Sequence, residues 1–284
     1  MSLDRWLLCV ATALCLSPLA QAAGTLDKIR ASKTILLGYR EASIPFSYSG
    51  EDNQPWGYSV ELCTKVAAAI VRHLALDELQ LQWVPVTPET RIAKLKSGAI
   101  DLECGSTTSS LSRMKEVDFS LPTFVDGGAY LTRRSAGIRR LADLAGRKIA
   151  VAAGTTSERA IAGALKQDKV SGELIKVSDH QQGLVALAQG VVDAYVSDRS
   201  LLIGLALDSG KQTDWILGPE TFSYEPYALM MRRNDADFRL VVNGELARLS
   251  RSGEIFTIYD RWFGFLAQPG ERLENVYFLN GLPE

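Results

Sequence analysis

Short apolar runs alternate with amphipathic segments along most of the chain. The runs are rich in β-branched and aromatic residues, whereas the segments between them repeat apolar residues at helical spacing. The predicted strands are residues 34–40, 79–86, 99–104, 148–153, 173–177 and 192–196. The predicted helices are residues 60–75, 90–98, 156–168, 180–190 and 238–253. This alternation predicts an α/β fold with largely parallel sheets.

The first 22 residues have a different pattern. A single arginine precedes an apolar run from Trp6 to Leu16, and Pro18 and the Ala20-Gln21-Ala22 triplet follow. This order predicts a secretory signal peptide over residues 1–22 that is cleaved after Ala22, and therefore an exported protein of the periplasm. A lipoprotein is the alternative, because Cys15 lies in the run. We prefer the soluble exported form, since a small residue is expected directly before a lipidated cysteine.

A short internal repeat suggests two lobes built on a similar plan. The stretches LKSGAID, starting at Leu95, and LAQGVVD, starting at Leu187, share Leu, then Gly three residues later, then Asp three further on. In both cases a helix ends, a glycine caps it and a strand leaves. The repeat places Ser106 and Asp198 at equivalent positions, each at the carboxyl end of a strand. Ligands of open α/β sheets bind at such ends, so two facing edges would form a cleft.

Hydroxyl side chains cluster after two of the strands. The stretch ECGSTTSSLSR brings Ser106 and Thr108 close to Arg113, and GTTSE brings Thr156 to the start of a helix. Hydroxyls and free backbone N–H groups at a helix start suit an anion, and a guanidinium can add a bidentate contact. Plain helix caps, with Arg113 in solvent, are the alternative.

Other charged residues also stand at predicted strand-to-helix turns. Arg40 directly follows the stretch TILLGY of the first predicted strand, Arg91 begins a helix, and Asp198 and His180 follow strands of the second half. Each alone has an ordinary explanation: a solvated arginine, a helix cap or a surface loop. Together, three arginines, one aspartate and many hydroxyls match a ligand with two anionic groups and one cation. An acidic amino acid has that charge pattern.

Composition and motifs exclude several other functions. The formal net charge of −2 gives no support for nucleic-acid binding. Two histidines and no Cys/His cluster argue against a metal site, and no cofactor is expected. The hydrolase GxSxG, HExxH and phosphate-loop motifs do not occur. Cys63 and Cys104 remain after signal cleavage, and their pairing depends on a separation that the sequence leaves open.

From about Thr25 to about Gly264 the sequence resembles the solute-binding proteins of polar amino-acid ABC importers, the bacterial family 3 type, and especially the glutamate/aspartate-binding branch. The resemblance rests on TLDKIRASKTILLGYREASIPFSY, GYSVELCTKVAAAI, DLECGSTTSSLSRMKEVDFS, ADLAGRKIAVAAGTTSE and YDRWF. The chain departs from the family at Ser59, where an acidic residue is usual, and at Pro88, where this branch often has serine.

The resemblance implies roles for eight residues. Arg113 with Ser106 and Thr108 would hold the α-carboxylate, and Asp198 would pair with the α-ammonium. Arg40 and Arg91 would clamp the side-chain carboxylate. Thr156 and His180 would contribute from the second lobe.

The resemblance also implies an architecture and a partner. The fold would have two lobes joined by two strands near residues 125–131 and 224–230. Lobe 1 would comprise residues 24–125 with 225–284, and lobe 2 residues 126–224. The protein would be a monomer that serves an inner-membrane ABC permease. The alternatives are a periplasmic enzyme of the cyclohexadienyl-dehydratase type, for which no paired acid and base is visible, and a binding protein that serves a sensor.

Overall fold

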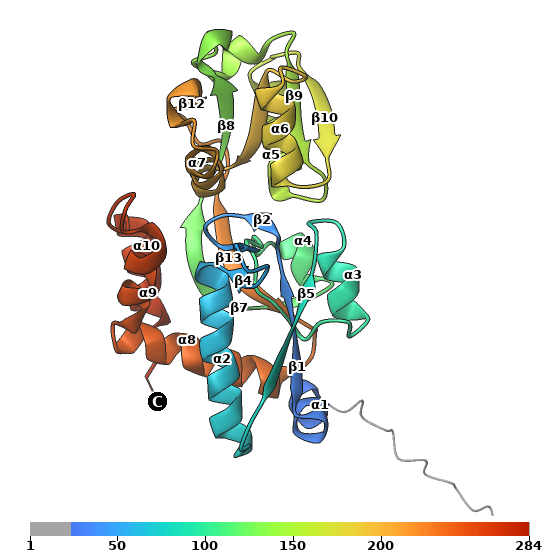
Figure 1. The fold of residues 1–284 in the computed structure, drawn as a ribbon, viewed down its shortest axis with the longest axis vertical. Helices are drawn as coiled ribbons and strands as arrows, with labels where there is room; N and C mark the ends of the chain where they lie inside the picture. The colour runs from blue at the N-terminus through green and yellow to red at the C-terminus, as the bar shows by residue number, and fades with distance from the viewer. Residues whose placement is uncertain (1–23, 284) are drawn as a thin grey trace, which may run out of the picture.

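The computed structural model describes residues 24–283, so the signal peptide predicted over residues 1–22 lies outside the described residues. The chain forms two α/β lobes stacked along the long axis of the molecule (Figure 1). This arrangement confirms the predicted fold class, and every strand and helix predicted from the sequence is present with shifted ends.

The lower lobe in Figure 1 contains both ends of the described chain. Its N-terminal part consists of α1 (Thr25–Ser32), β1 (Thr34–Tyr39), β2 (Ala42–Ser43), β3 (Ser47–Ser49), β4 (Pro55–Trp56), α2 (Tyr58–Leu74), β5 (Gln80–Pro85), α3 (Arg91–Lys96), β6 (Leu102–Glu103), α4 (Leu111–Met114) and β7 (Asp118–Asp126). Its C-terminal part consists of β13 (Glu225–Met231), α8 (Ala236–Arg251), α9 (Glu254–Phe263) and α10 (Glu271–Asn280).

The upper lobe is built from the middle of the chain. Its elements are β8 (Gly128–Arg133), two 3₁₀ turns (Arg134–Ala136 and Leu141–Leu144), β9 (Lys148–Ala152), α5 (Thr156–Gln167), β10 (Glu173–Val177), α6 (His180–Ala188), β11 (Ala194–Asp198), α7 (Arg199–Asp208), a third 3₁₀ turn (Gln212–Asp214) and β12 (Trp215–Leu217).

The two main sheets repeat one pattern. Their strand orders are β5-β1-β6-β13-β7 and β10-β9-β11-β8-β12. In each sheet the first three strands are parallel, and the last two pair antiparallel with their neighbours. The prediction of largely parallel sheets therefore holds for the first three strands of each sheet. It fails for the last two, β13 and β7 in one sheet and β8 and β12 in the other, and three of these strands (β7, β8 and β13) belong to the segments that cross between the lobes.

The internal repeat in the sequence corresponds to a repeated structure. Gly98 and Gly190 both have positive φ, at 78° and 75°. The aspartates that follow, Asp101 and Asp193, accept hydrogen bonds from the backbone N–H groups of Leu36 and Lys148 at 3.0 and 2.9 Å. Each aspartate thus fixes a strand against its parallel neighbour, and the residues beyond it reach the same edge of their sheet.

The chain crosses between the lobes twice. β7 ends at Asp126 and continues into β8 after one residue, and β13 begins with Glu225 paired to Asp126. The two crossing segments therefore lie side by side (Figure 1). We propose lobe boundaries at these crossings, with lobe 1 comprising residues 24–125 and 225–284 and lobe 2 residues 126–224.

Each lobe has its own hydrophobic core. In the lower lobe the buried face of α2 packs on the sheet, together with a cluster of rings from Phe46, Tyr58, Phe124 and Phe263. Burial of one such side chain stabilises the fold by roughly 1.5–3 kcal/mol. In the upper lobe two clusters lie on either face of the sheet, around Tyr195 and Ile149.

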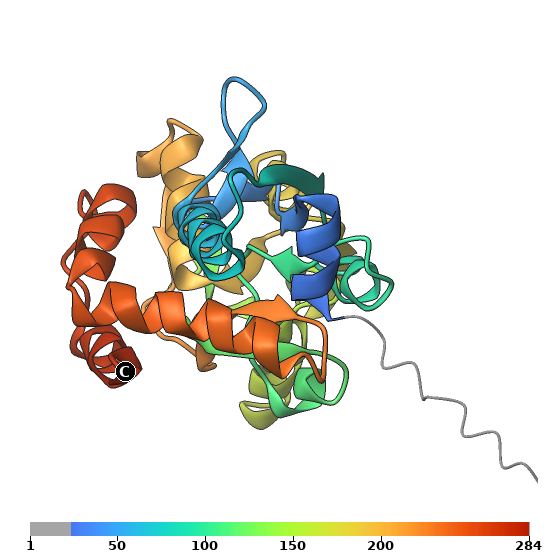
Figure 2. The same ribbon diagram turned by 90° about the horizontal axis from the view of Figure 1, so that it is seen from below.

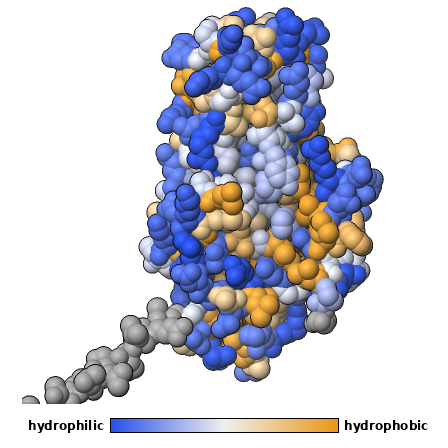
Figure 3. Space-filling view, turned by 180° about the vertical axis from the view of Figure 1, so that it is seen from behind, coloured by the Kyte–Doolittle hydropathy of each residue, from blue (hydrophilic) through white to orange (hydrophobic). Residues whose placement is uncertain are grey.

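The C-terminal segment packs on the lower lobe. Seen from below, α8 runs across this lobe and α9 and α10 lie at one end of it (Figure 2). Asn280 donates a hydrogen bond to the carbonyl oxygen of Pro122 in β7, and the Tyr277 and Tyr58 hydroxyls are 2.9 Å apart. Phe265, Phe278 and Leu279 stay exposed, and hydrophobic residues gather on that side of the lobe in Figure 3.

Candidate functional site

A small enclosed cavity lies between the lobes, where the carboxyl ends of both sheets face each other. It contains seven of the eight residues predicted from the sequence. The lining residues are Arg40, Arg91, Ser106, Thr108, Thr155, Thr156, Ser157, His180, Ser197, Asp198 and Leu201. A larger groove of about 820 Å³ between α1, α2 and α8 contains none of the predicted residues and lies far from the second lobe.

Arg113, the eighth residue, lies directly behind this cavity. Its Nη1 donates to the carbonyl oxygen of Thr108 at 2.7 Å, and its Nη2 donates to the carbonyl oxygen of Gly154 at 3.2 Å. The second bond links the two lobes. Burial, followed by the positive charges of Arg91 and Arg159, lowers the pKa of Arg113 to about 9. The alternative of a solvated Arg113 is therefore wrong.

Arg40 places an unused guanidinium on the wall of the cavity. It follows directly after β1, and its backbone N–H is fixed by a 2.9 Å bond to Ser47 Oγ. The guanidinium itself makes no hydrogen bond or ion pair to other described residues. Burial, and next the charge of Arg91, lower its pKa to about 10. A buried cation with all its donors free is a strong site for an anion.

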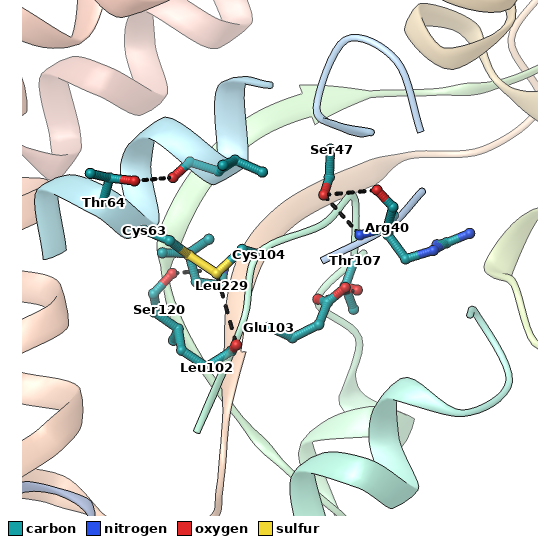
Figure 4. The surroundings of a disulfide bond; sticks show 11 residues. Arg40, Ser47, Cys63, Thr64, Leu102, Glu103, Cys104, Thr107, Ser120 and Leu229 are labelled. Atoms are coloured by element: carbon teal, nitrogen blue, oxygen red, sulfur yellow. Dashed lines mark hydrogen bonds between the residues drawn. A yellow bond between two sulfur atoms is a disulfide. The ribbon is translucent and has the colours of Figure 1, made fainter. Parts of the chain in front are cut away.

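Arg91 is held by a chain of two hydrogen bonds. Its Nη1 donates to Thr107 Oγ1 at 2.6 Å, and that hydroxyl donates to Glu103 Oε2, also at 2.6 Å. Glu103 is fully buried, and its side chain points toward Thr107 in Figure 4. Arg91 Nε and Glu103 Oε1 have no hydrogen-bond partner among the described residues. The bond from Nη1 thus fixes the orientation of Arg91, while its Nε–H donates to no described residue.

Asp198 is the acidic residue of the cavity wall. Its carboxylate accepts hydrogen bonds from Ser157 Oγ at 2.6 Å and from the hydroxyl of Tyr227. It stands at the N-cap position of α7 but makes no side-chain cap bond, so the alternative of a plain helix cap is wrong. Burial, followed by the charges of Glu225 and Asp126, raises the pKa of Asp198 to about 7. A cationic group at this point would favour its ionised form.

His180 and Thr156 come from the starts of two helices in the upper lobe. His180 is buried, which excludes the surface-loop alternative, and its Nδ1 lies 2.6 Å from the Tyr195 hydroxyl. Burial, with Arg40 and Arg91 nearby, lowers its pKa well below the usual value, so the ring is neutral. Thr156 is the first residue of α5, after the N-cap Thr155, and its hydroxyl donates to Glu225 Oε2 at 2.6 Å.

Two buried carboxylates of the site, Glu103 and Glu225, are absent from the residues predicted from the sequence. Glu103 ends β6 and Glu225 begins β13, positions at which a glutamate gives no local signal of burial. Three arginines in and behind the cavity therefore face three acids rather than one: Glu103, Asp198 and Glu225. The only available signal was the position of Glu225 at the predicted second crossing between the lobes.

Cys63 and Cys104 form a disulfide, with their Cα atoms 6.1 Å apart. The bond ties α2 to the end of β6, one residue from Glu103 (Figure 4). The strand end that leads into the hydroxyl cluster is thereby fixed covalently. A disulfide of this kind is typical of proteins outside the reducing cytosol.

None of the helices in residues 24–283 combines the length and apolarity needed to cross a bilayer. No group of three or more His, Cys, Asp or Glu side chains in the same range is arranged to hold a metal ion.

Comparison with known proteins places the chain among bacterial binding proteins. The L-glutamate/L-aspartate-binding protein of Pseudomonas aeruginosa is 40% identical over 244 residues, which cover 86% of this chain and 81% of the relative. The glutamate/aspartate import solute-binding protein of Escherichia coli K12 is 34% identical over 245 residues, with coverages of 86% and 81%. These curated relatives are binding proteins.

The fold agrees with solved structures of such proteins. The ancestral amino acid-binding protein AncCDT-1, described as a precursor of cyclohexadienyl dehydratase, superimposes with a TM-score of 0.73 at 26% identity, covering 84% of this chain and 99% of its own. The model of the bacterial extracellular solute-binding proteins, family 3, matches residues 35–265. The chain belongs to this family of extracellular solute-binding proteins.

Proposed function

We propose that this protein binds an acidic amino acid, glutamate or aspartate, in the periplasm and delivers it to an ABC permease of the inner membrane. The observation that carries the proposal is the pair of buried guanidiniums on one wall of the cavity. Within residues 24–283, the Arg40 guanidinium makes no hydrogen bond or ion pair, and Arg91 Nε makes no hydrogen bond. Burying two such cations costs free energy unless an anion pairs with them. A carboxylate on the side chain of the ligand could accept hydrogen bonds from both guanidiniums.

The other groups of the cavity complete the recognition of an α-amino acid. Arg113, Ser106 and Thr108 would hold the α-carboxylate, with Thr156 contributing from the second lobe. Asp198 would pair with the α-ammonium, because Ser157 and Tyr227 hold its carboxylate in place. Neutral His180 would donate or accept a hydrogen bond beside Arg40 without adding charge. Because the ligand would touch both lobes, its binding would stabilise the closed form.

A binding role fits the site better than catalysis. An enzyme of the cyclohexadienyl-dehydratase type needs a free acid or base beside its substrate. Glu103 is committed to Thr107, and Glu225 accepts hydrogen bonds from Thr108, Thr156 and Ser223. His180 is neutral and bonded to Tyr195. We therefore propose that the protein is not an enzyme. We also propose that it acts as a monomer, and that it is exported and cleaved after Ala22.

Calorimetry on protein that has been unfolded, stripped of carried ligand and refolded tests the proposal. Glutamate or aspartate should bind far more tightly than glutamine or arginine. Tighter binding of arginine or lysine would contradict it. A thermal-shift screen of the twenty amino acids would reveal any other preference.

A further inference from the structure

Glu225 occupies the point where both lobes and a crossing strand meet. Its Oε2 accepts hydrogen bonds from Thr108 Oγ1 of the lower lobe and from Thr156 Oγ1 of the upper lobe, both at 2.6 Å. Its Oε1 accepts from Ser223 Oγ at 2.6 Å. The side chain is buried, at 2% exposure, and begins β13. The carboxylate thus uses hydroxyl donors from both walls of the cavity.

These are the same hydroxyls that a ligand carboxylate would need. A threonine hydroxyl has only one hydrogen to donate. The two oxygens Thr108 Oγ1 and Thr156 Oγ1 lie 3.2 Å apart, so they serve one acceptor position. While both donate to Glu225 Oε2, neither can donate to a second carboxylate.

Charge adds to this conflict. Charged and titratable groups face Glu225 from four elements: Arg113 of α4, Asp126 of β7, Asp198 of β11 and Tyr227 of β13. Arg113 is the one cation of this set, and it would also have to serve the ligand. Two carboxylates sharing one buried site do not both remain ionised easily.

We propose that Glu225 competes with the ligand's α-carboxylate for the Thr108 and Thr156 hydroxyls, and that it takes up one proton when an amino acid binds. This proposal rests on the proposed function in one respect: it requires that an α-amino acid binds at this site. The proton comes from the buffer acid and forms an O–H bond on the Glu225 carboxylate. A proton on Oε2 turns that oxygen into a donor, so the two threonine hydroxyls can donate to the ligand carboxylate instead, and the like-charge repulsion between the two carboxylates disappears.

Asp198 gives the proton uptake a characteristic dependence on pH. Its pKa is raised to about 7 by burial and by the neighbouring carboxylates, and a ligand ammonium would favour its ionised form. At about pH 8 Asp198 is already ionised, so the proton for Glu225 comes from solution, about one per ligand. At about pH 6 Asp198 carries a proton that it loses on binding, and the net uptake falls toward zero.

Titration calorimetry measures this uptake directly. L-Glutamate is titrated into the protein in phosphate and in Tris at about pH 8, and in phosphate and in Bis-Tris at about pH 6. The slope of the observed enthalpy against the ionisation enthalpy of the buffer gives the number of protons. The wild type should show a slope of about one at the higher pH. Glu225→Gln should reduce this slope to near zero and bind glutamate at least as tightly at about pH 8.

The matched control is Glu220→Gln, which changes an exposed glutamate five positions away and should keep the wild-type slope. Ser223→Ala removes the third donor to Glu225 without touching the two threonines, and should extend the uptake to higher pH. A wild-type slope of zero at about pH 8, or an unchanged slope in Glu225→Gln, overturns the proposal. If Glu225→Gln does not fold, the wild-type slope and Ser223→Ala still decide.

Failure of the proposed function has a different signature. If L-glutamate gives no heat of binding, the acidic ligand class is wrong, and the same titrations are run with L-glutamine, which carries the same α-carboxylate. A slope of about one with glutamine at about pH 8 would support the Glu225 proposal and reject the glutamate proposal. A slope of zero with every amino acid that binds would reject the Glu225 proposal alone.

Discussion

Gly204 of α7 lies against the backbone of Ile44 in the other lobe: a Cβ atom on Gly204 would come within 2.4 Å of the Ile44 carbonyl oxygen. The absence of a side chain at Gly204 therefore allows the lobes to approach this closely. Together with the Arg113–Gly154 bond, this contact depends on the closed arrangement of the lobes.

Gly204→Ala should weaken ligand binding by disfavouring closure. Overpacking of a close contact costs typically about 1–3 kcal/mol, which corresponds to roughly a fivefold to hundredfold loss of affinity. Calorimetry with glutamate measures the loss, and small-angle scattering should show that the wild type with ligand has a smaller radius of gyration than the variant.

Gly163→Ala is the matched control, because Gly163 also lies in a helix of the upper lobe and has open space around its Cβ position. It should bind as the wild type does. Equal affinity of Gly204→Ala and Gly163→Ala, or a scattering profile of the wild type that does not change on ligand saturation, would contradict a hinge-closing mechanism.

Asp198→Asn should weaken the binding of every amino acid, because all of them carry the ammonium group. Breaking a buried ion pair costs roughly 3–5 kcal/mol, of which an isosteric amide retains part. Calorimetry at about pH 8, where wild-type Asp198 is ionised, gives the loss. Normal affinity in the variant would show that the ammonium binds elsewhere.

The same substitution should change how the stability of the ligand-free protein depends on pH. The pKa of Asp198 in the fold, about 7, lies above its unfolded value of about 3.9. The folded state therefore binds more protons between these values, and the free energy of unfolding falls as the pH rises through about 7. At about 1.4 kcal/mol per pKa unit, the effect is on the order of a few kcal/mol.

Urea unfolding of wild type and Asp198→Asn at about pH 5 and about pH 8 measures this difference. The variant should gain stability relative to the wild type at the higher pH, since its amide does not ionise. Titration of His180 contributes to both proteins and cancels in the comparison. A difference in the free energy of unfolding that stays the same at both pH values would contradict a raised pKa of Asp198.

The fold could be predicted well where local patterns decide it. The LxxGxxD repeat identified two equivalent strand starts, and the structure shows Asp101 and Asp193 in the same contact with a neighbouring strand. The antiparallel crossings could not be predicted in this way, because pairing of β13 with β6 and β7 joins segments about a hundred residues apart. Short strands such as β2 and β4 carry too few residues for a period to be visible.

The residues that line the site could largely be predicted from the sequence, but the number of acidic groups beside the arginines could not. Arg40 and Asp198 stand at strand ends and Arg91 begins a helix, where polar groups are expected from the sequence. Glu103 ends β6 and Glu225 begins β13, and a glutamate at such a position gives no local signal of burial. Only the tertiary contacts with Thr107, Thr108 and Thr156 reveal them. The roles of the eight predicted residues in ligand binding stay a prediction.

Arg40 and Arg113 should differ in what they recognise. Arg40 lies with Arg91 at one wall and would serve only the side-chain carboxylate, whereas Arg113 would serve the α-carboxylate common to all amino acids. A desolvated carboxylate that loses its partner costs a few kcal/mol, or on the order of a hundredfold in affinity. The neutral amide of glutamine loses less, because it never needed the positive charge.

Arg40→Ala should therefore reduce the difference in binding affinity between glutamate and glutamine. Arg113→Ala should weaken the binding of both ligands and leave that difference nearly unchanged. Arg40 is the cleaner of the two side-chain arginines to remove, since its guanidinium bonds no described residue, whereas Arg91→Ala also leaves Thr107 and Glu103 without their cation. Calorimetry of both variants against both ligands decides the assignment, with thermal unfolding to check the fold. If Arg40→Ala lowers the two affinities by the same factor, the side-chain carboxylate lies elsewhere.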